Sequence, residues 1–208
     1  MSRLSRLAQM LDLQVKFNGV ALPTWRTAPP AFSRAVWIEC AEIMECHTGW
    51  KWWKAAPKAD ATQAHIELVD IWHFLMSWHL VTPAARVQEL LPPAAGSVSV
   101  DVSAIEAIEV LALAALAGDL GRATASFWFV CELFGLNFEQ LHRLYIGKNA
   151  LNHHRSLFGY KTGGYEKMWD GREDNAHLAE IMGAGVVEFD AVVSALAHRY
   201  RSIFTAAA

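Results

Sequence analysis

An all-α fold, organised as a single domain over residues 1–208, is what this sequence predicts, and three observations support that prediction. Apolar residues recur every three to four positions along most of the chain, which is the spacing of helices with one buried face. Most breaks between these segments contain proline or glycine. No stretch sustains the alternation of apolar and polar residues that a half-buried strand requires.

Three helices are expected in the first half of the chain, over residues 5–17, 32–47 and 62–81. Each has residues at its ends that start or stop helices. Asn18 and Gly19 follow the first helix, and Asp60 stands where an N-cap of the third would be. These positions define the first three elements.

Four further helices are expected in the second half: one ending near residue 117, one through 127–134, one over 138–158 and a last one over 175–204. Asp101 or Ser103 is expected to cap the first of these, and Asn137 the third. The remaining stretches, 83–100 and 159–171, are rich in proline, glycine or small residues. Both are therefore expected to be loops.

Charge and composition restrict the partners that this chain can have. The formal net charge is −3, which does not suit a nucleic-acid-binding protein. The most apolar run, 110–117, is much shorter than a membrane span, and the first residues lack the apolar core of a signal peptide, so no membrane partner is expected. Three cysteines without paired spacings suit reduced thiols in the cytoplasm. Hydrophobic residues make up 53% of the chain, a balance that indicates apolar surface buried against a second copy.

Two pairs of carboxylates have the spacing that places both members on one helical face: Glu39 with Glu42, and Glu67 with Asp70. Both helices are apolar around most of their circumference, so these narrow acidic faces must look inward or into a cleft. Carboxylates gathered there need a cation or hydrogen-bond donors between them. Mg²⁺ best suits such oxygen ligands. The pattern predicts metal-dependent chemistry on a phosphate ester, although either pair alone would more simply be a solvated surface pair.

Between the two pairs lies the block Trp50-Lys51-Trp52-Trp53-Lys54. Tryptophans bury large areas and lysines extend past them, so the block suits a structural anchor. It equally suits a nucleotide site, with a ring for stacking and ammonium groups for phosphate. The residues alone leave both alternatives open.

Two later features have a structural and a functional interpretation. His73, one turn after the second acid pair, is either a packed, hydrogen-bonded residue or a contact to a sugar hydroxyl. Lys148, Asn152 and Arg155 share one helical face, and Lys161 follows them. This group suits phosphate binding, and the alternative is a solvated basic helix end, because cations favour helix C-termini.

Taken together, the segments ECAE, GWKWWK, ELVDIWHF, KNALNHHR and GYKTGGYEKMWDGREDN resemble those of the dimeric all-α dUTPases. These enzymes belong to the all-α NTP pyrophosphatase superfamily, with the MazG-like enzymes. The resemblance runs from Gln14 to about Asn175. The four acids are common to the superfamily, whereas the tryptophan block and the late segments are more specific. His153 and His154 stand where the family often has an aromatic residue, and residues 83–135 do not match residue by residue.

The resemblance implies a helical bundle of the all-α NTP pyrophosphatase type that forms a homodimer and hydrolyses dUTP to dUMP and diphosphate, which limits uracil incorporation into DNA. The Mg²⁺ ligands it implies are Glu39, Glu42, Glu67 and Asp70. The catalytic residues would be Glu42, which orients or deprotonates the attacking water, and Glu39. The substrate contacts it implies are Gln14 and Asn18 for uracil, Trp53 near the base, His73 and Asn175 near the sugar or base, and Lys148, Asn152, Arg155 and Lys161 for the phosphates and nucleotide.

Two alternatives compete with this hypothesis. A dCTP pyrophosphatase or one of broad specificity would keep the metal site and change the base. A non-catalytic helical dimerisation module would use the acids for structure, but it does not explain the separate basic face. Whether dUDP is also a substrate is left open by the sequence.

Overall fold

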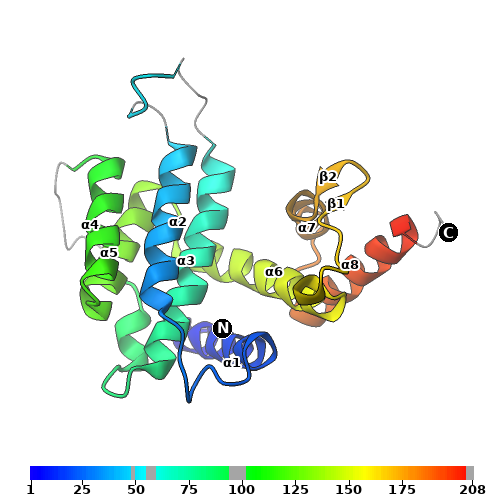
Figure 1. Cartoon of the computed structure of the whole chain (residues 1–208), viewed down its shortest axis with the longest axis horizontal. Helices are drawn as coiled ribbons and strands as arrows, with labels where there is room; N and C mark the ends of the chain where they lie inside the picture. Colours follow the sequence, from blue (N-terminus) through cyan, green and yellow to red (C-terminus); the bar gives the residue numbers. More distant parts are fainter. Residues whose placement is uncertain (48–49, 55–59, 94–101, 205–208) are drawn as a thin grey trace.

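The computed structural model describes residues 1–47, 50–54, 60–93 and 102–204, and helices make up most of it (Figure 1). The α-helices in these residues are α1 (Arg3–Ala21), α2 (Phe32–Cys46), α3 (Ala61–Val81), α4 (Ala104–Leu116), α5 (Leu120–Leu133), α6 (Phe138–Leu157), α7 (Asp174–Gly183) and α8 (Phe189–Phe204). Two 3₁₀ turns, η1 (Val87–Leu90) and η2 (Tyr160–Thr162), and two short strands, β1 (Met168–Trp169) and β2 (Arg172–Glu173), complete them. The predicted all-α fold is confirmed.

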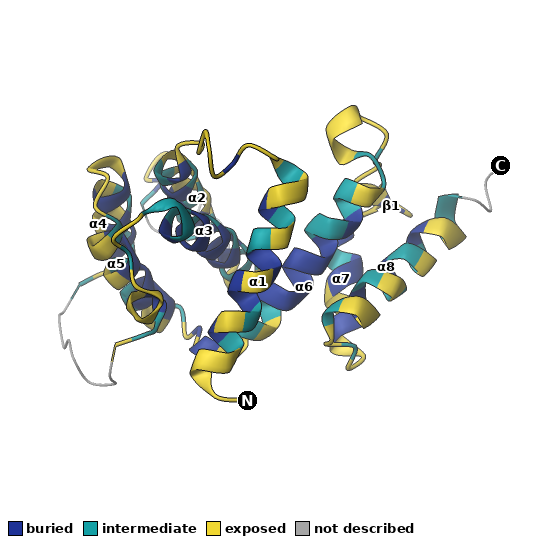
Figure 2. Ribbon diagram, turned by 90° about the horizontal axis from the view of Figure 1, so that it is seen from below, coloured by how far each residue is buried: buried dark blue, intermediate teal, exposed yellow. Residues whose placement is uncertain are grey.

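Helix α6 connects two groups of helices. Its first half packs against α1 and α3 of an N-terminal bundle formed by α1–α5, and its second half packs against α7 and α8. We call β1, β2, α7 and α8 the C-terminal lobe, which Figure 1 places at the opposite end of α6 from α4 and α5. The middle of α6 is almost entirely buried (Figure 2). Each group has its own apolar core, and α6 contributes to both.

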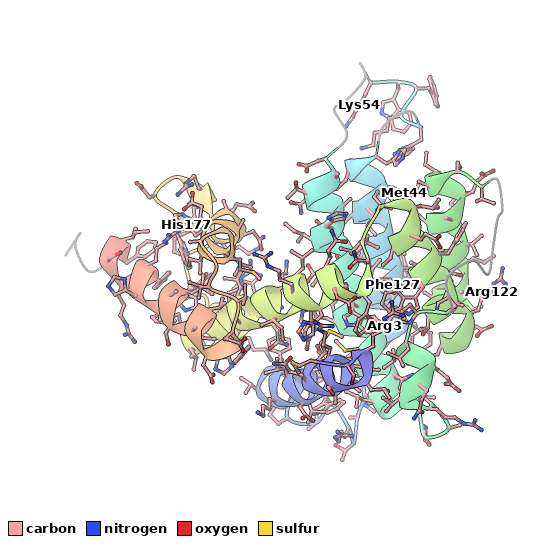
Figure 3. The ribbon with its side chains drawn as sticks, turned by 180° about the vertical axis from the view of Figure 1, so that it is seen from behind. Arg3, Met44, Lys54, Arg122, Phe127 and His177 are labelled. Carbon is pink, nitrogen blue, oxygen red and sulfur yellow. The ribbon has the colours of Figure 1, made fainter. Side chains whose placement is uncertain are left out.

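The core of the N-terminal bundle is built around Trp72 of α3, which is fully buried. Its ring stacks on Phe127 of α5 at a centroid distance of 5.4 Å, and Figure 3 shows Phe127 within this bundle. The Trp72 indole N–H points at the sulfur of Met10 in α1, 3.3 Å away. Large aromatic rings dominate core energetics, so these contacts fix α1, α3 and α5 relative to one another.

Side-chain caps begin the helices where the sequence predicts them. The Asp60 carboxylate accepts a hydrogen bond from the backbone N–H of Gln63, and the Asn137 side chain accepts one from Gln140, each at 2.9 Å. Ser103, not Asp101, caps α4; Asp101 and residues 94–100 lie outside the described residues. These caps satisfy N–H groups that the first turn of a helix leaves without partners.

The C-terminal lobe differs from the prediction in two respects. The expected helix 175–204 is two helices, because Gly185 takes a left-handed φ of 91° that ends α7. The expected loop 159–171 contains β1, which pairs antiparallel with β2 through a turn at Asp170 and Gly171. Both turn residues have positive φ, which Asp-Gly accommodates better than most pairs. The hairpin precedes α7 and the break precedes α8, and both of these helices pack against α6. No helix in the described part of the chain has the length and apolar character needed to cross a membrane.

Candidate active site

A cleft with a volume of about 650 Å³ lies between the N-terminal bundle and the C-terminal lobe. Side chains from α1, α2, α3, α6, η2, β2 and α7 line it, so both groups of helices contribute. Every site residue expected from the sequence lines this cleft except Trp53 and Lys161. The structure therefore gathers residues that are up to 161 positions apart, from Gln14 to Asn175, in one place.

The carboxylates of the two acid pairs meet on one wall of the cleft. An oxygen atom from each of Glu39, Glu67 and Asp70 lies within 4.8 Å of the others. Glu42 also lines the cleft, but its carboxylate is not in this tight group of the described residues. Helix α2 packs closely along α3, and the i, i+3 spacing turns both acidic faces to the same side.

Burial and the mutual repulsion of these acids raise the pKa values of two of them, Glu39 and Glu67. Burial, and then the charges of Asp70, Glu42 and Glu67, raise the pKa of Glu39 to about 8. Burial also raises the pKa of Glu67, against a hydrogen bond from Gln63 that lowers it. Such shifts mean that the cluster resists holding its full negative charge by itself. A hard divalent cation fits this set of oxygen donors and would offset that charge.

Among the described residues, one cationic side chain forms an ion pair with the cluster. Lys148 of α6 is buried, and its Nζ lies 2.9 Å from Oδ2 of Asp70. A single ammonium group faces four carboxylates, so the described residues leave an excess of negative charge at this wall. Lys148 thus links the acidic wall to the basic segment of α6.

A buried hydrogen-bond network forms a second part of the cleft, at α1 and α3. The Gln14 amide nitrogen donates to Oδ1 of Asn18 at 2.9 Å and to Oγ of Ser77 at 3.0 Å. Its amide oxygen accepts from Nδ1 of His73 at 2.7 Å and from the Tyr145 hydroxyl at 3.0 Å. Gln14 therefore hydrogen-bonds to three neighbours that also line the cleft, namely Asn18, His73 and Ser77.

His73 is an uncharged ring in this network. Burial, and then the charge of Lys148, lower its pKa to about 3. Because Nδ1 donates to Gln14, Nε2 acts as an acceptor, and Nε2 is buried with no hydrogen-bond partner among the described residues. A buried unpaired acceptor costs free energy, so this atom suits a donor on a bound molecule.

The basic segment of α6 forms a further part of the cleft lining. Arg155 donates from Nε and Nη2 to the two oxygens of Asp174, at 2.8 and 2.7 Å, and from Nη1 to Oδ1 of Asn152 at 3.3 Å. Asn175 follows Asp174 at the start of α7, and its buried Oδ1 has no hydrogen-bond partner in the part of the chain that the structure describes. The functional interpretation of this segment, phosphate binding, is consistent with its position in the cleft.

The tryptophan block lies elsewhere, on the connection between α2 and α3. Figure 3 shows its last residue, Lys54, beyond the ends of these helices. Lys51 is buried, pairs with Glu45 and lies over the ring of Trp50, which suits an anchor. Trp53 is 56% exposed, so its expected contact with the base stays a prediction. Lys161 is likewise exposed, in η2.

Several residues that complete the cleft were not expected from the sequence. Tyr160, Lys167 and Glu173 line it from the segment after α6, and Gln63 lines it from α3. Gln63 stands four residues before Glu67 and hydrogen-bonds to it, a helical spacing that was readable in advance. Lys167 had no such signal, because its position depends on the β1–β2 hairpin.

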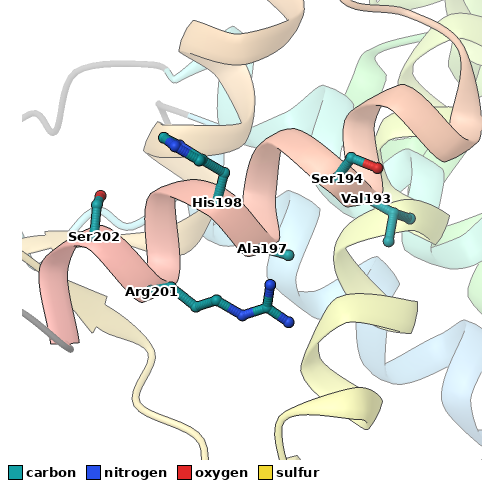
Figure 4. A pocket seen from close by; sticks show the side chains of 6 residues that line it. All are labelled: Val193, Ser194, Ala197, His198, Arg201 and Ser202. Carbon is teal, nitrogen blue, oxygen red and sulfur yellow. The ribbon is translucent and has the colours of Figure 1, made fainter.

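A second hollow lies along α8 and has different chemistry. Figure 4 shows its side chains, which include His198, Arg201 and Ser202, and no carboxylate is among them. Its oxygen donors are the hydroxyls of Ser194 and Ser202, which are poorer ligands for a hard cation than carboxylates. The cleft between the two groups of helices is therefore the candidate active site.

An all-α fold whose cleft holds clustered carboxylates together with lysine and arginine side chains suits the class of all-α nucleotide pyrophosphatases. The family model described as dUTPase matches residues 6–160. The chain belongs to this family and is a dUTP diphosphatase, which hydrolyses dUTP to dUMP and diphosphate. No curated protein matches the chain.

Proposed function

We propose that Glu39, Glu42, Glu67 and Asp70 hold Mg²⁺ for the hydrolysis of dUTP. The observation that carries this proposal is the group of three carboxylates within 4.8 Å of one another, of which Glu39 has a pKa raised to about 8. When bound, Mg²⁺ would supply positive charge to the phosphate oxygens and lower the pKa of a water molecule. The carboxylates would be its ligands and would fix its position.

Glu42 would orient the attacking water and accept its proton. It is exposed to the cleft and is not part of the tight group, which leaves its carboxylate available for water. Glu39, one turn earlier on α2, would support it as the second catalytic glutamate. A general base must be ionised and within reach of the proton that it removes.

The phosphates would lie along α6. Lys148, Asn152 and Arg155 would contact the phosphate oxygens, with Lys161 as predicted from the sequence and Lys167 as a further cation of the cleft wall. Positive groups held in place before the reaction stabilise the charge that develops on the phosphates.

The uracil ring would lie against the network of α1 and α3. Asn18 and His73, oriented by Gln14, would hydrogen-bond to the base or sugar, and Asn175 would do so from α7. Trp53 remains the predicted neighbour of the base. A site built to pair the polar edge of uracil rejects a base that leaves these groups unpaired.

Diphosphate release measured with dUTP, dCTP, dTTP and UTP in the presence of Mg²⁺ tests the base assignment. We expect kcat/KM for dUTP to exceed that for dCTP by at least about 100-fold, because cytosine mispairs with a network built for uracil. Similar rates with all four nucleotides would favour the broad-specificity alternative. No release with any of them would favour the non-catalytic alternative.

The cellular role we propose is to limit uracil incorporation into DNA, in the cytoplasm and as a single domain. Free Cys40, Cys46 and Cys131 suit a reducing compartment. The contribution of α6 to both cores supports a single folding unit. dUDP is a candidate second substrate, because the same base and sugar contacts would be available to it.

We also propose that the protein is a homodimer through the outer face of α4. The inner face of α4 packs on α2 and α5, whereas Val110, Leu113 and Leu116 are 39%, 54% and 65% exposed. Their spacing puts them on one side of the helix, and such a stripe is rarely left in water. Light scattering should give twice the chain mass, and Leu113→Glu should shift the equilibrium toward monomer. A monomeric wild type at micromolar concentration would contradict this proposal.

A further inference from the structure

The guanidinium group of Arg155 is clamped by a residue of the C-terminal lobe. Asp174 accepts two hydrogen bonds from it, from Nε at 2.8 Å and from Nη2 at 2.7 Å. A bidentate pair of this kind fixes the plane of the guanidinium as well as its distance. We propose that Asp174 and Tyr165 are positioning residues that hold Arg155 toward the substrate phosphates; this rests on the proposed contact between Arg155 and phosphate.

Asp174 is itself held from two further directions. The Tyr165 hydroxyl donates to its Oδ2 at 2.9 Å, and the Asp174 backbone N–H donates to the carbonyl of Lys167 at 3.0 Å. Asp174 is 1% exposed. Burial alone would raise the pKa of Asp174, but the hydrogen bonds and charge of Arg155, with the Tyr165 hydroxyl, keep it below its ordinary value. Asp174 is therefore an ionised and immobile partner for Arg155.

The support extends to α8. The rings of Tyr165 and Tyr200 stack at a centroid distance of 5.3 Å with an angle of 10° between their planes. The Tyr200 hydroxyl accepts a hydrogen bond from the backbone N–H of Glu166 at 3.2 Å. A chain of direct contacts thus runs from Tyr200 through Tyr165 and Asp174 to Arg155. The three residues that support Arg155, namely Tyr165, Asp174 and Tyr200, lie after residue 160, where the match to the dUTPase family ends.

Stability alone gives a weak reason for this arrangement. The side chains of Arg155 and Asp174 are 12% and 1% exposed, so both charges are largely removed from water. The desolvation of a buried pair roughly cancels its attraction, and apolar residues of similar size are often as stable. Arg155, however, lines the cleft and retains N–H groups that Asp174 does not use. Holding these N–H groups toward the cleft is a role that an apolar replacement of the pair could not perform.

A double-mutant cycle in the full-length protein tests this proposal. We expect Asp174→Asn to lower kcat/KM for dUTP by about 100-fold, the loss typical of a displaced substrate contact, and Tyr165→Phe to lower it by about 5-fold. In an Arg155→Ala background, Asp174→Asn should lower kcat/KM by less than about 2-fold further, because the residue that Asp174 positions is absent. Asp170→Asn, an exposed acid on the same hairpin, should change kcat/KM little and serves as the matched control.

Two readouts separate positioning from a general loss of structure. Inhibition by deoxyuridine, which has no phosphate, should be unchanged in Tyr165→Phe and Asp174→Asn, whereas a disordered lobe would weaken it. Tyr165→Phe keeps the ion pair and serves if Asp174→Asn fails to fold. If Arg155→Ala strongly lowered kcat/KM and Asp174→Asn lowered it by the same factor with or without Arg155, the positioning proposal would be overturned. The proposed contact between Arg155 and phosphate would then still stand. No effect of Arg155→Ala would overturn both, while turnover of dUTP by the wild type would still support the family's activity.

Discussion

Replacing Glu42 by glutamine is expected to lower kcat for dUTP by about 10²- to 10⁴-fold, the usual contribution of a general base. Glutamine has nearly the same size and can still hydrogen-bond to water, but it cannot accept a proton at neutral pH. Glu42 is exposed to the cleft, so its replacement should change the melting temperature by little. Rates of diphosphate release at saturating dUTP and Mg²⁺, with thermal melting followed by circular dichroism, measure the two effects separately.

Glu45→Gln is the matched control for this variant. Glu45 lies one turn further along α2, is exposed, and pairs with Lys51 without lining the cleft. The substitution removes the same charge from the same helix, and exposed pairs of this kind contribute little. We expect kcat within about 2-fold of the wild type, because no transition-state contact is lost. Near-normal activity in Glu42→Gln would exclude Glu42 as the base and move that role to another carboxylate of the cleft.

The sequence predicts most of the fold because the signals in this chain are local. Caps such as Asp60 and Ser103 satisfy the N–H groups of their own first turn, so they act within three or four residues. The acid pairs are readable for the same reason, since i, i+3 spacing fixes their common face once a helix forms. The convergence of the two pairs needed one further fact, the packing of α2 on α3.

The features that the sequence did not reveal depend on turns and on distant contacts. The turn at Asp170 and Gly171 forms the hairpin that follows Lys167, and Gly185 divides the last helix. Both are short signals within a long segment that otherwise suits a loop or a helix. Asp174 was not expected because its partner, Arg155, is 19 positions away and meets it only after the hairpin forms. Such pairings require the tertiary structure.

Neutralising one ligand of the acid cluster should have opposite effects on activity and on stability. We expect Glu39→Gln to abolish most turnover and, in metal-free buffer at pH 8, to raise the melting temperature. The folded protein disfavours the charged form of Glu39, because burial and the neighbouring acids raise its pKa from 4.5 to about 8. Glutamine carries no charge and so avoids this energetic cost. The cleft is open to water, which screens part of this effect, so we expect a gain in the free energy of unfolding of about 1–3 kcal/mol.

The pH dependence follows from the sign of that shift. Between pH 4.5 and 8 the folded protein holds a proton on Glu39 that the unfolded chain has released. The metal-free wild type should therefore lose stability as the pH rises through this window, and Glu39→Gln should lose less. Melting temperatures measured at pH 5, 6, 7 and 8 with a chelator present test this directly.

Added Mg²⁺ should reverse the order of the two proteins. A cation that binds the folded cluster and not the unfolded chain stabilises the wild type by mass action, and Glu39→Gln has lost one ligand. Glu132→Gln, an exposed acid of α5, removes one charge away from the cleft, so the difference between its melting temperature and that of the wild type should not depend on Mg²⁺. If Mg²⁺ stabilised Glu39→Gln as strongly as the wild type, Glu39 would not be a ligand. If the metal-free variant melted below the wild type at pH 8, the burial of the Glu39 charge and its repulsion by the other acids would not be what limits the stability of the folded protein.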